Sequence, residues 1–288
     1  MYKIAILGCE NSHANHFLEL IKQGCYPEME VVGLYSNEPE AVKKLSDTYN
    51  VPIMQDYGEL KGKVDGVMIT ARHGDNHHIY AKPYMDDGIP MFIDKPITCT
   101  EEDALEFMNT AKSKGIRLCG GSTCVSYPNT VKLAQAVADK SIGELLGGTL
   151  VCPFYFDSPY GGFYFYAQHL VEIMTTIFGE DVKKVFVSRS RDELTFVAKY
   201  DTISVTGKYI EGCKYYNASV YGSDKMMSEE LTGYGDSFKH EMNDMLSLLQ
   251  GNEMKKSYRS FVKPVFIMNA ILRSLDSGKW EDVKEYDI

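Results

Sequence analysis

Residues 2–13 read YKIAILGCENSH, and this stretch decides the fold of the first half of the chain. A compact apolar run, Ile4–Leu7, ends at Gly8, and the segment His13–Gln23 that follows has apolar residues at helical spacing. The stretch therefore predicts a strand, a turn and a helix. In a parallel sheet such a turn lies at the carboxyl end of a strand, where ligands bind.

The same alternation of strand and helix continues to about residue 121. The predicted strands are Val31–Tyr35, Val64–Thr70, Met91–Ile93 and Arg117–Cys119, and the predicted helices are Glu38–Tyr49, Ile79–Asp87 and Glu101–Lys114. Pro39 suits the first turn of its helix. Repeated β-α units with right-handed crossovers predict an α/β fold with a doubly wound parallel sheet.

After residue 121 the pattern changes without a linker or a repeat. Strand-like runs joined by short connections predict an antiparallel meander: Leu150–Phe156, Val182–Arg189, Leu194–Tyr200, Ile203–Ile210 and Cys213–Tyr221. Helices are expected at Asn129–Lys140, His169–Phe178, His240–Leu249 and Phe261–Leu275. We therefore predict two domains, residues 1–121 and residues 122–288.

The composition narrows the classes of function. The 288 residues carry 30 Lys and Arg against 40 Asp and Glu, a formal net charge of −10, and no basic run. Such a chain repels a phosphate backbone, which excludes nucleic acid as a partner. No apolar stretch reaches the roughly 20 residues that cross a bilayer, so we expect no membrane partner and a cytoplasmic location. The seven cysteines form no C-x-x-C pair and are expected to be reduced thiols.

The turn after the first strand departs from the G-x-G-x-x-G pattern of nucleotide-binding folds. Only Gly8 is present, because Glu10 and His13 occupy the other two glycine positions. A carboxylate beside a diphosphate is repulsive, unless Glu10 points to solvent and the amides of residues 11–13 still bind an anion. His13 and His16 lie one helical turn apart, but capping or packing is the commoner role for such residues, and we expect no metal.

Two further loops follow predicted strands. Ser36 and Asn37 end the second strand, where an acid would favour NAD and an Arg would favour NADP, so they decide neither. Thr70, Arg72 and His77 belong to a polar loop in the position of a ligand loop, although solvated histidines explain its composition more simply.

The fourth strand ends in Asp94-Lys95-Pro96. Proline favours an extended backbone at Lys95, which fixes the ammonium near the carboxyl end of the strand. A lysine there is able to hydrogen-bond or deprotonate a substrate hydroxyl. The alternative is an ordinary surface lysine before a proline.

Taken in order along nearly the whole chain, these segments resemble the Gfo/Idh/MocA family, named after glucose-fructose oxidoreductase and inositol dehydrogenase. Residues 94–96 are similar to the family's E-K-P motif, with Asp in place of Glu, and residues 64–81 resemble its strand, loop and H-x-x-x-A helix start. Residues 142–144 are similar to its I-G-E motif. Residues 161–179 resemble its glycine-rich segment with D-x-G-x-H-x-x-D, and several short motifs within residues 221–279 also resemble the family.

The resemblance implies a Rossmann domain followed by an α+β domain whose open, mainly antiparallel sheet often makes a dimer interface. It also implies reversible hydride transfer between NAD or NADP and the carbinol carbon of a sugar, polyol or related small hydroxy compound. A homodimer or homotetramer is expected. The cofactor would be held by groups at the carboxyl ends of the strands, namely Gly8, Asn11, Ser12, His13, Ser36, Asn37, Thr70, Arg72, His77, Asp94 and Lys95.

Two residues match the catalytic positions of the family. Lys95 would orient the substrate hydroxyl, and His169 would be the acid/base, with an unperturbed pKa of about 6.5 that suits proton exchange at neutral pH. Both would contact the substrate.

The surroundings of His169 depart from the family pattern. The family Asp four positions before the histidine is Phe165 here. Tyr164 and Tyr166 are the neighbouring candidates to donate a hydrogen bond to a substrate, and Glu172 either orients the imidazole or lies outside the site. Because Glu10 and Phe165 both depart at functional positions, a catalytically inactive ligand-binding or regulatory protein on the same scaffold is the alternative.

Overall fold

The computed structural model describes all 288 residues, which form two compact units. The first unit consists of Met1–Gly121, Phe238–Phe261 and Ile288, and the second consists of Ser122–Ser237 and Val262–Asp287. The chain first changes unit after Gly121, where the sequence pattern changes, and it returns to the first unit for Phe238–Phe261.

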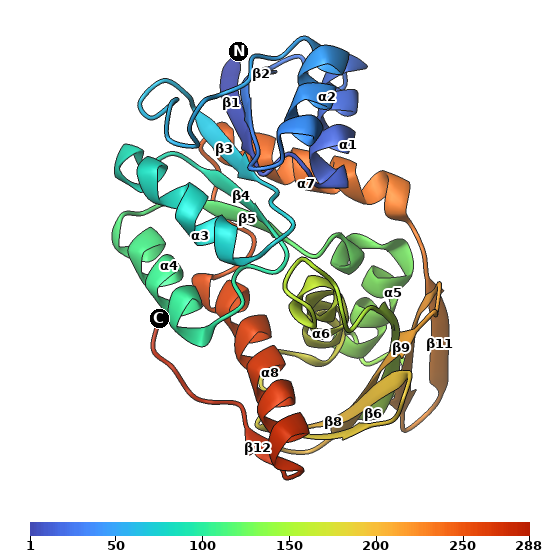
Figure 1. Cartoon of the computed structure of the whole chain (residues 1–288). Coiled ribbons are helices and arrows are strands. Elements are labelled where there is room, and N and C mark those ends of the chain that lie inside the picture. Colours follow the sequence, from blue (N-terminus) through green and yellow to red (C-terminus); the bar gives the residue numbers. More distant parts are fainter. The chain divides into compact units, whose positions relative to one another are not determined.

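A five-stranded parallel sheet forms the centre of the first unit (Figure 1). Its strands are β1 (Tyr2–Leu7), β2 (Met29–Tyr35), β3 (Gly66–Ile69), β4 (Met91–Asp94) and β5 (Leu118–Gly121). All neighbours pair in parallel in the order β2-β1-β3-β4-β5, and an isolated bridge between Leu34 and Ile53 extends the sheet beyond β2. The strand order reverses between β1 and β3, which is where an open α/β sheet forms a ligand crevice.

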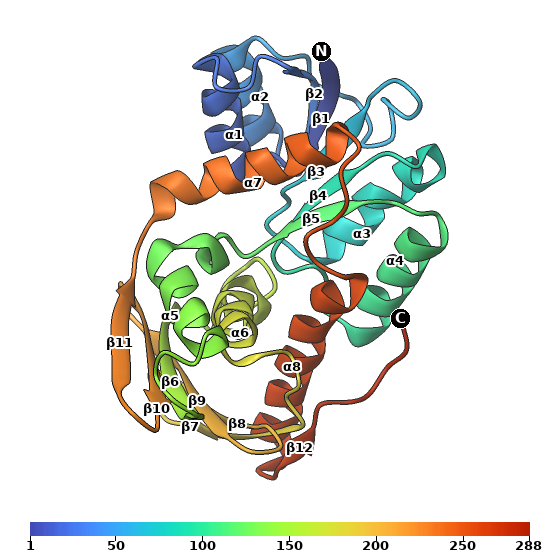
Figure 2. The same ribbon diagram turned by 180° about the vertical axis from the view of Figure 1, so that it is seen from behind.

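Helices cover both faces of this sheet, so the predicted doubly wound fold is confirmed. They are α1 (Ser12–Lys22), α2 (Pro39–Tyr49), α3 (Asp75–Ala81) and α4 (Glu101–Ser113), with a 3-10 helix η1 at Lys82–Asp87. Helices α3 and α4 lie on the face opposite α7 (Tyr234–Leu249), as Figures 1 and 2 show. The predicted helix Ile79–Asp87 is wrong in its bounds, since the α-helix ends at Ala81 and Pro83 has no N–H to continue it.

Helix α7 supplies part of the core of the first unit (Figure 2). Its apolar side chains are buried in one cluster with Phe17 of α1 and Phe92 of β4, and they are Phe238, Met242, Met245 and Leu248. The sequence pattern assigned this helix to residues 122–288, whereas the structure places Phe238–Phe261 in the first unit. An amphipathic helix reveals that one face is buried but not which element buries it.

A seven-stranded sheet forms the second unit, and it is mainly antiparallel as expected. Its strands are β6 (Leu145–Phe154), β7 (Lys184–Arg189), β8 (Glu193–Lys199), β9 (Ser204–Glu211), β10 (Tyr216–Gly222), β11 (Met226–Leu231) and β12 (Glu281–Asp282). The order is β11-β10-β6-β9-β8-β7-β12, with β6 and β9 parallel. The prediction of a simple meander is wrong, because β6 lies between β9 and β10.

Helices pack on one face of this second sheet. They are a 3-10 helix η2 (Thr123–Ser126), α5 (Pro128–Ala138), α6 (Tyr164–Phe178) and α8 (Tyr258–Ser277). Gly148 and Gly207 allow α6 to approach the strands, because a Cβ on Gly148 would lie 2.3 Å from Phe178 and one on Gly207 would lie 2.8 Å from Leu170. Helix α6 begins at Tyr164 instead of the predicted His169, so the neighbouring aromatic residues belong to the same helix as the histidine.

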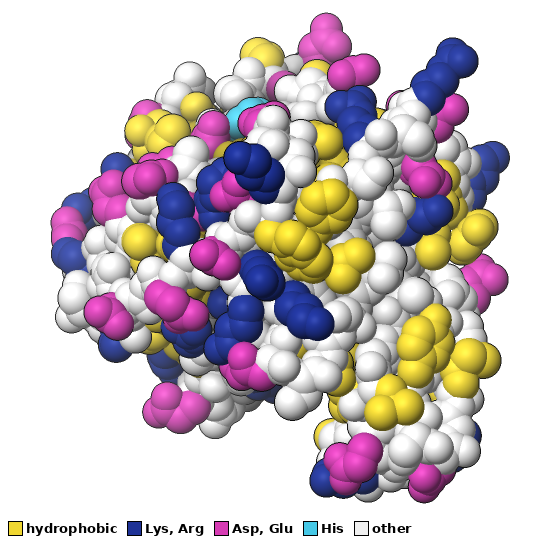
Figure 3. All heavy atoms as spheres, turned by 90° about the horizontal axis from the view of Figure 1, so that it is seen from below, with side chains coloured by type: hydrophobic (Ala, Val, Ile, Leu, Met, Phe, Trp, Pro, Cys, Tyr) yellow, Lys and Arg dark blue, Asp and Glu magenta, His cyan; other side chains and the backbone are white.

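The helices, the charged side chains and the cysteines are arranged as the composition predicts. No helix is both long enough and apolar enough to span a bilayer. Acidic, basic and hydrophobic side chains are interspersed on the face drawn in Figure 3. The seven cysteines form no disulfide, and five of them are buried.

Candidate functional site

The turn after β1 is built by a glycine that no other residue can replace without displacing a neighbour. Gly8 has a φ of +77°, and a Cβ there would lie 2.4 Å from the backbone of Ala71. The hydroxyl of Thr70 donates to the Gly8 carbonyl at 3.0 Å, and the Thr70 N–H donates to Leu7. The end of β1 is therefore fastened to the end of β3, at the point where the strand order reverses.

Glu10 does not point to solvent, so that expectation is wrong. The side chain is only 7% exposed. The Ser36 hydroxyl donates to its Oε2 at 2.6 Å, and the backbone N–H of Arg72 donates to its Oε1 at 3.0 Å. The carboxylate is thus turned toward the ends of β2 and β3, and the first turn of α1 contains no acidic side chain.

The start of α1 has no side-chain cap. Asn11 is the N-cap residue, but its side chain does not accept from the helix amides and instead donates to Asp94 Oδ2 at 2.8 Å. The exposed Ser12 contacts only Asn11 through its hydroxyl, at 3.3 Å. The first-turn amides of α1 are therefore not blocked by an acceptor from these side chains, which suits an anion.

Asp94 is the most deeply buried charged residue of the site. It is fully buried at the end of β4, and His13 Nδ1 lies 3.1 Å from its Oδ2. Burial alone would raise the pKa of Asp94, but the nearby charges of His13, Lys95 and His77 and the hydrogen bond from His13 outweigh it and lower the pKa to about 2. The His13 ring also packs edge-on against Phe238, so His13 is a packing and pairing residue inside the unit.

Lys95 is not a surface lysine. It is 5% exposed and follows Asp94, whose carboxylate accepts from the Lys95 backbone N–H at 2.7 Å. Its backbone lies directly after β4, at the carboxyl end of the strand. A buried lysine is uncommon, and burial at the end of a parallel strand is typical of a functional group.

The other cofactor candidates of the first unit differ in burial and in contacts. His77 is completely buried, with Nδ1 2.6 Å from the Pro96 carbonyl oxygen and Nε2 2.8 Å from the Ala71 carbonyl oxygen. It joins the loops after β3 and β4, so the explanation of this loop by solvated histidines is wrong for His77. Asn37 is exposed, and Arg72 contacts Glu10 through its backbone.

In the second unit, His169 is held by the segment that follows β5. Its Nδ1 lies 2.7 Å from the Ser122 hydroxyl and 3.6 Å from Cys124 Sγ. The rings of Tyr166 and Tyr216 flank the imidazole, with centroids at 5.7 and 6.1 Å. The imidazole is therefore fixed in orientation by one hydroxyl and two aromatic rings.

Glu172 acts on His169 through Ser122. Its Oε1 accepts from the Ser122 backbone N–H at 2.9 Å and from Gln168 Nε2 at 2.6 Å. Glu172 is buried, so it is not an outward helix carboxylate. It fixes the residue whose hydroxyl contacts the imidazole.

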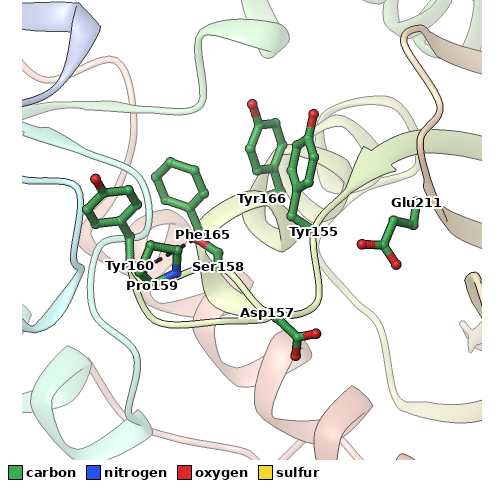
Figure 4. Close-up of a pocket in the computed structure, with 8 residues that line it drawn as sticks. All are labelled: Tyr155, Asp157, Ser158, Pro159, Tyr160, Phe165, Tyr166 and Glu211. Atoms are coloured by element: carbon green, nitrogen blue, oxygen red, sulfur yellow. Dashed lines mark hydrogen bonds between the residues drawn. The ribbon is translucent and has the colours of Figure 1, made fainter.

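A pocket of about 470 Å³ opens beside α6 (Figure 4). Its lining is aromatic and acidic, and consists of Tyr155, Asp157, Ser158, Pro159, Tyr160, Phe165, Tyr166 and Glu211. Figure 4 shows the rings of Tyr155 and Tyr166 side by side with their hydroxyls pointing the same way, and their centroids are 5.2 Å apart. Tyr166 also contacts His169, so this residue joins the pocket to the histidine.

The candidate substrate residues do not all reach this pocket. Tyr164 donates its hydroxyl to Asn269 of α8 at 2.9 Å and is not among the lining residues. Phe165 and Tyr166 do line the pocket. Sequence reasoning missed Ser122, Cys124 and Tyr155; Ser122 directly follows β5, so the rule that ligand groups follow strand ends would have found it.

Comparisons with known proteins agree with this fold. Residues 2–121 match a family model described as an oxidoreductase family with an NAD-binding Rossmann fold, Gfo/Idh/MocA. None of the curated protein sequences matches the chain. The expectation of a nicotinamide cofactor is therefore confirmed at the level of this family.

Solved structures show the same fold over nearly the whole chain. A putative myo-inositol dehydrogenase from Sinorhizobium meliloti has a TM-score of 0.86 at 15% identity and covers 99% of this chain and 100% of its own. The scyllo-inositol dehydrogenase of Lactobacillus casei, solved with NAD(H) and scyllo-inositol, has a TM-score of 0.86 at 12% identity and coverages of 98% and 99%. GenD2 from gentamicin A biosynthesis, solved with NAD, has a TM-score of 0.85 at 14% identity and coverages of 99% and 97%. Residues 2–121 of the chain are thus similar to the Gfo/Idh/MocA oxidoreductase family in its NAD-binding Rossmann fold.

Proposed function

We propose that the protein is an NAD(P)-dependent oxidoreductase that transfers a hydride to or from the carbinol carbon of a sugar, polyol or related small hydroxy compound. The observation that carries this proposal is the turn after β1, in which the Glu10 carboxylate is turned away from the uncapped start of α1. The residues present therefore fit a dinucleotide despite the missing glycines. The pyrophosphate would be bound by the first-turn amides of α1, beside Gly8.

The reaction needs two protein groups besides the cofactor. Oxidation of a carbinol removes a hydride, which the bound nicotinamide accepts, and a proton, which a protein base must take. We assign the proton to His169, whose Nδ1 is held by Ser122. Lys95 is assigned to hydrogen-bond the substrate hydroxyl, because it is a buried lysine directly after β4, with its backbone N–H bonded to Asp94.

The pocket of the second unit supports a polyhydroxylated substrate. Tyrosine rings bind the C–H faces of sugars and cyclitols, and their hydroxyls add hydrogen bonds. Tyr155, Tyr160 and Tyr166 line the pocket and would supply both kinds of contact. Inositol dehydrogenases are among the similar structures, and cyclitols are therefore included in the first substrates to test.

The test combines binding with turnover. NADH and NADPH are titrated by fluorescence, and NAD⁺- and NADP⁺-dependent oxidation is then measured on a panel of inositols, hexoses and sugar acids. Lys95→Ala is expected to lower kcat/KM by at least about a hundredfold, a much larger effect than its effect on nucleotide binding. Lys112→Ala, which changes an exposed lysine of α4, is the matched control. Absence of binding by both nucleotides would rule out the proposal.

A second function is favoured by one residue. Phe165 places an aromatic ring in the pocket wall, where the family pattern has a carboxylate. A protein that binds a sugar without oxidising it is the corresponding candidate. It predicts that a panel compound raises the melting temperature while no nicotinamide reduction is detected with any of them.

We also propose that the protein is a homodimer or homotetramer in the cytoplasm. The side chains of β6, β8 and β9 alternate between buried and half-exposed, and α5 and α6 pack on the buried side. The other side of the sheet is open for a second copy of the chain. Light scattering coupled to gel filtration tests the assembly, and Thr206→Arg in the middle of the open face should produce monomers.

A further inference from the structure

The Glu10 carboxylate lies where three loops of the first unit meet. Glu10 belongs to the turn after β1, its Oε2 accepts from Ser36 directly after β2, and its Oε1 accepts from the Arg72 N–H after β3. The two hydrogen bonds hold the carboxylate in one position. Each oxygen keeps a further lone pair that is able to accept another hydrogen bond.

This position has a defined role in dinucleotide-binding folds. An acidic residue at the tip of the second strand accepts a hydrogen bond from the 2′-hydroxyl of the adenosine ribose. In this chain β2 ends at Tyr35 and is followed by Ser36 and Asn37, neither of which is acidic. Glu10 instead brings a carboxylate to the same strand end from the turn after β1, at 2.6 Å from the Ser36 hydroxyl.

The negative charge of Glu10 affects the tyrosines that lie near the ends of β2 and β3. Burial raises the pKa of the Tyr35 and Tyr80 hydroxyls, and the Glu10 charge raises both further. The rings of Tyr35, Tyr57 and Tyr80 form a cluster with centroids 5.2 to 5.7 Å apart. Arg72 is the one basic residue that contacts Glu10 directly, and it does so through its backbone N–H.

We propose that the Glu10 carboxylate binds the 2′-hydroxyl of the adenosine ribose and makes the site selective for NAD(H) over NADP(H). The inference rests on the proposed function, and it deepens that function by naming the cofactor. A 2′-hydroxyl would donate to the carboxylate, whereas a 2′-phosphate would bring two negative charges against it. The residue that breaks the glycine pattern thus becomes the residue that selects the cofactor.

The experiment measures equilibrium binding of NADH and NADPH to the full chain by fluorescence and by calorimetry. The wild type is expected to bind NADH at least about tenfold more tightly than NADPH, the effect of one to two unit charges at contact distance in a solvated site. Glu10→Gln has the same shape without the charge and should reduce this ratio to about threefold or less. Glu40→Gln removes an exposed carboxylate from the first turn of α2 and should leave the ratio unchanged.

A second variant guards against a folding defect. Glu10→Asp keeps the charge but withdraws the carboxylate from Ser36, and it should weaken NADH binding at least about threefold while NADPH remains the weaker ligand. Circular dichroism and the melting temperature verify that each variant is folded.

Four outcomes would overturn the inference. Equal binding of both nucleotides by the wild type, or an unchanged ratio in Glu10→Gln, contradicts it and leaves the proposed function intact. Tighter binding of NADPH would also contradict it, and would assign the 2′-position to Arg72. If neither nucleotide binds the wild type, the inference and the proposed function both fall.

Discussion

At the scale of single residues, Asp94 has the strongest electrostatic role in the first unit. It accepts hydrogen bonds from Asn11 and from the backbone of Lys95, and it pairs with His13. A carboxylate with these partners is stable only when ionised. Asp94 therefore joins the turn after β1 to the strand end that carries Lys95.

Asp94→Asn should lower the free energy of unfolding by about 2 kcal/mol at pH 7, because the native pKa is about 2 and the ordinary value is 3.8. The pKa is depressed in the folded state, so this stabilisation is complete above pH 3.8 and is lost as the pH falls from 3.8 toward 2. Urea unfolding of wild type and variant between pH 8 and pH 2 measures the difference.

Asp276→Asn, on the exposed side of α8, is the control and should not change stability. A difference between wild type and Asp94→Asn that grows as the pH falls below 4 would contradict the assigned direction of the pKa.

Lys95 and Glu10 show what the sequence reveals of single residues. The backbone position of Lys95 followed from its neighbours in sequence, because a residue that directly follows a buried strand must lie at the end of that strand. The direction of the Glu10 side chain did not follow, because it depends on Ser36 and Arg72, which are 26 and 62 residues away. The sequence around Glu10 does not show which residues from other strand ends contact its side chain.

At the scale of elements, the turn between β1 and α1 depends on the close approach of Gly8 to Ala71. Gly8→Ala adds a methyl 2.4 Å from the Ala71 backbone as well as strain at a φ of +77°. Gly24→Ala is a matched control, because Gly24 has a φ of +75° and no atom within 4 Å of the added methyl.

Both variants should lose about 1 kcal/mol from the backbone conformation, and Gly8→Ala should lose at least about 2 kcal/mol more from the clash. Thermal unfolding measures the stability of each variant, and titration with NADH measures whether the turn between β1 and α1 still binds the cofactor. Equal losses in the two variants would show that the contact with Ala71 is unimportant.

The segment at the start of η2 controls the proposed acid/base. Ser122→Ala removes the hydroxyl 2.7 Å from His169 Nδ1, and with it a hydrogen-bond partner that holds the imidazole in orientation. We expect kcat to fall about tenfold and the pH dependence of kcat to shift, with little change in KM.

Ser126→Ala, at the end of the 3-10 helix that Ser122 precedes, is the control, because its hydroxyl donates to the Thr123 carbonyl instead. Ser122→Thr keeps the hydroxyl and should recover most of the activity. An unchanged pH profile in Ser122→Ala would limit Ser122 to a structural role.

Elements were predictable where their apolar pattern was strong. Strand β1 and helix α4 are buried on regular positions and were found within a few residues. Strand β11 was missed because it lies at the sheet edge, pairs only with β10 and has the sequence MMSEEL with alternating exposed residues. An edge strand needs no apolar run, so its pattern resembles that of a loop.

At the scale of the whole molecule, the first unit depends on a segment from the second half of the chain. Residues 1–121 contain every strand of the parallel sheet, but α7 supplies four side chains of the core. The sequence could not predict this, because the buried face of α7 fits either domain equally well.

A fragment of residues 1–121 should therefore expose the core beside Phe17 and Phe92. We expect it to bind a hydrophobic dye and to unfold in urea at a lower midpoint than the intact protein, without a sharp transition. Adding residues 238–261 through a flexible linker should restore a cooperative transition. A sharp transition at the midpoint of the intact protein would show that α7 is dispensable.

Because the chain returns to the first unit only at Phe238, the first unit cannot be completed until long after residues 1–121 have been synthesised. Synthesis proceeds at about 5–20 residues per second, so the 116 residues between Gly121 and Phe238 take about 6 to 23 s to make. For that interval every strand of the parallel sheet has been synthesised, but helix α7, which covers part of its core, has not. We expect the apolar side chains that α7 covers to stay exposed until α7 emerges, and a pause in translation after Gly121 would prolong the exposure.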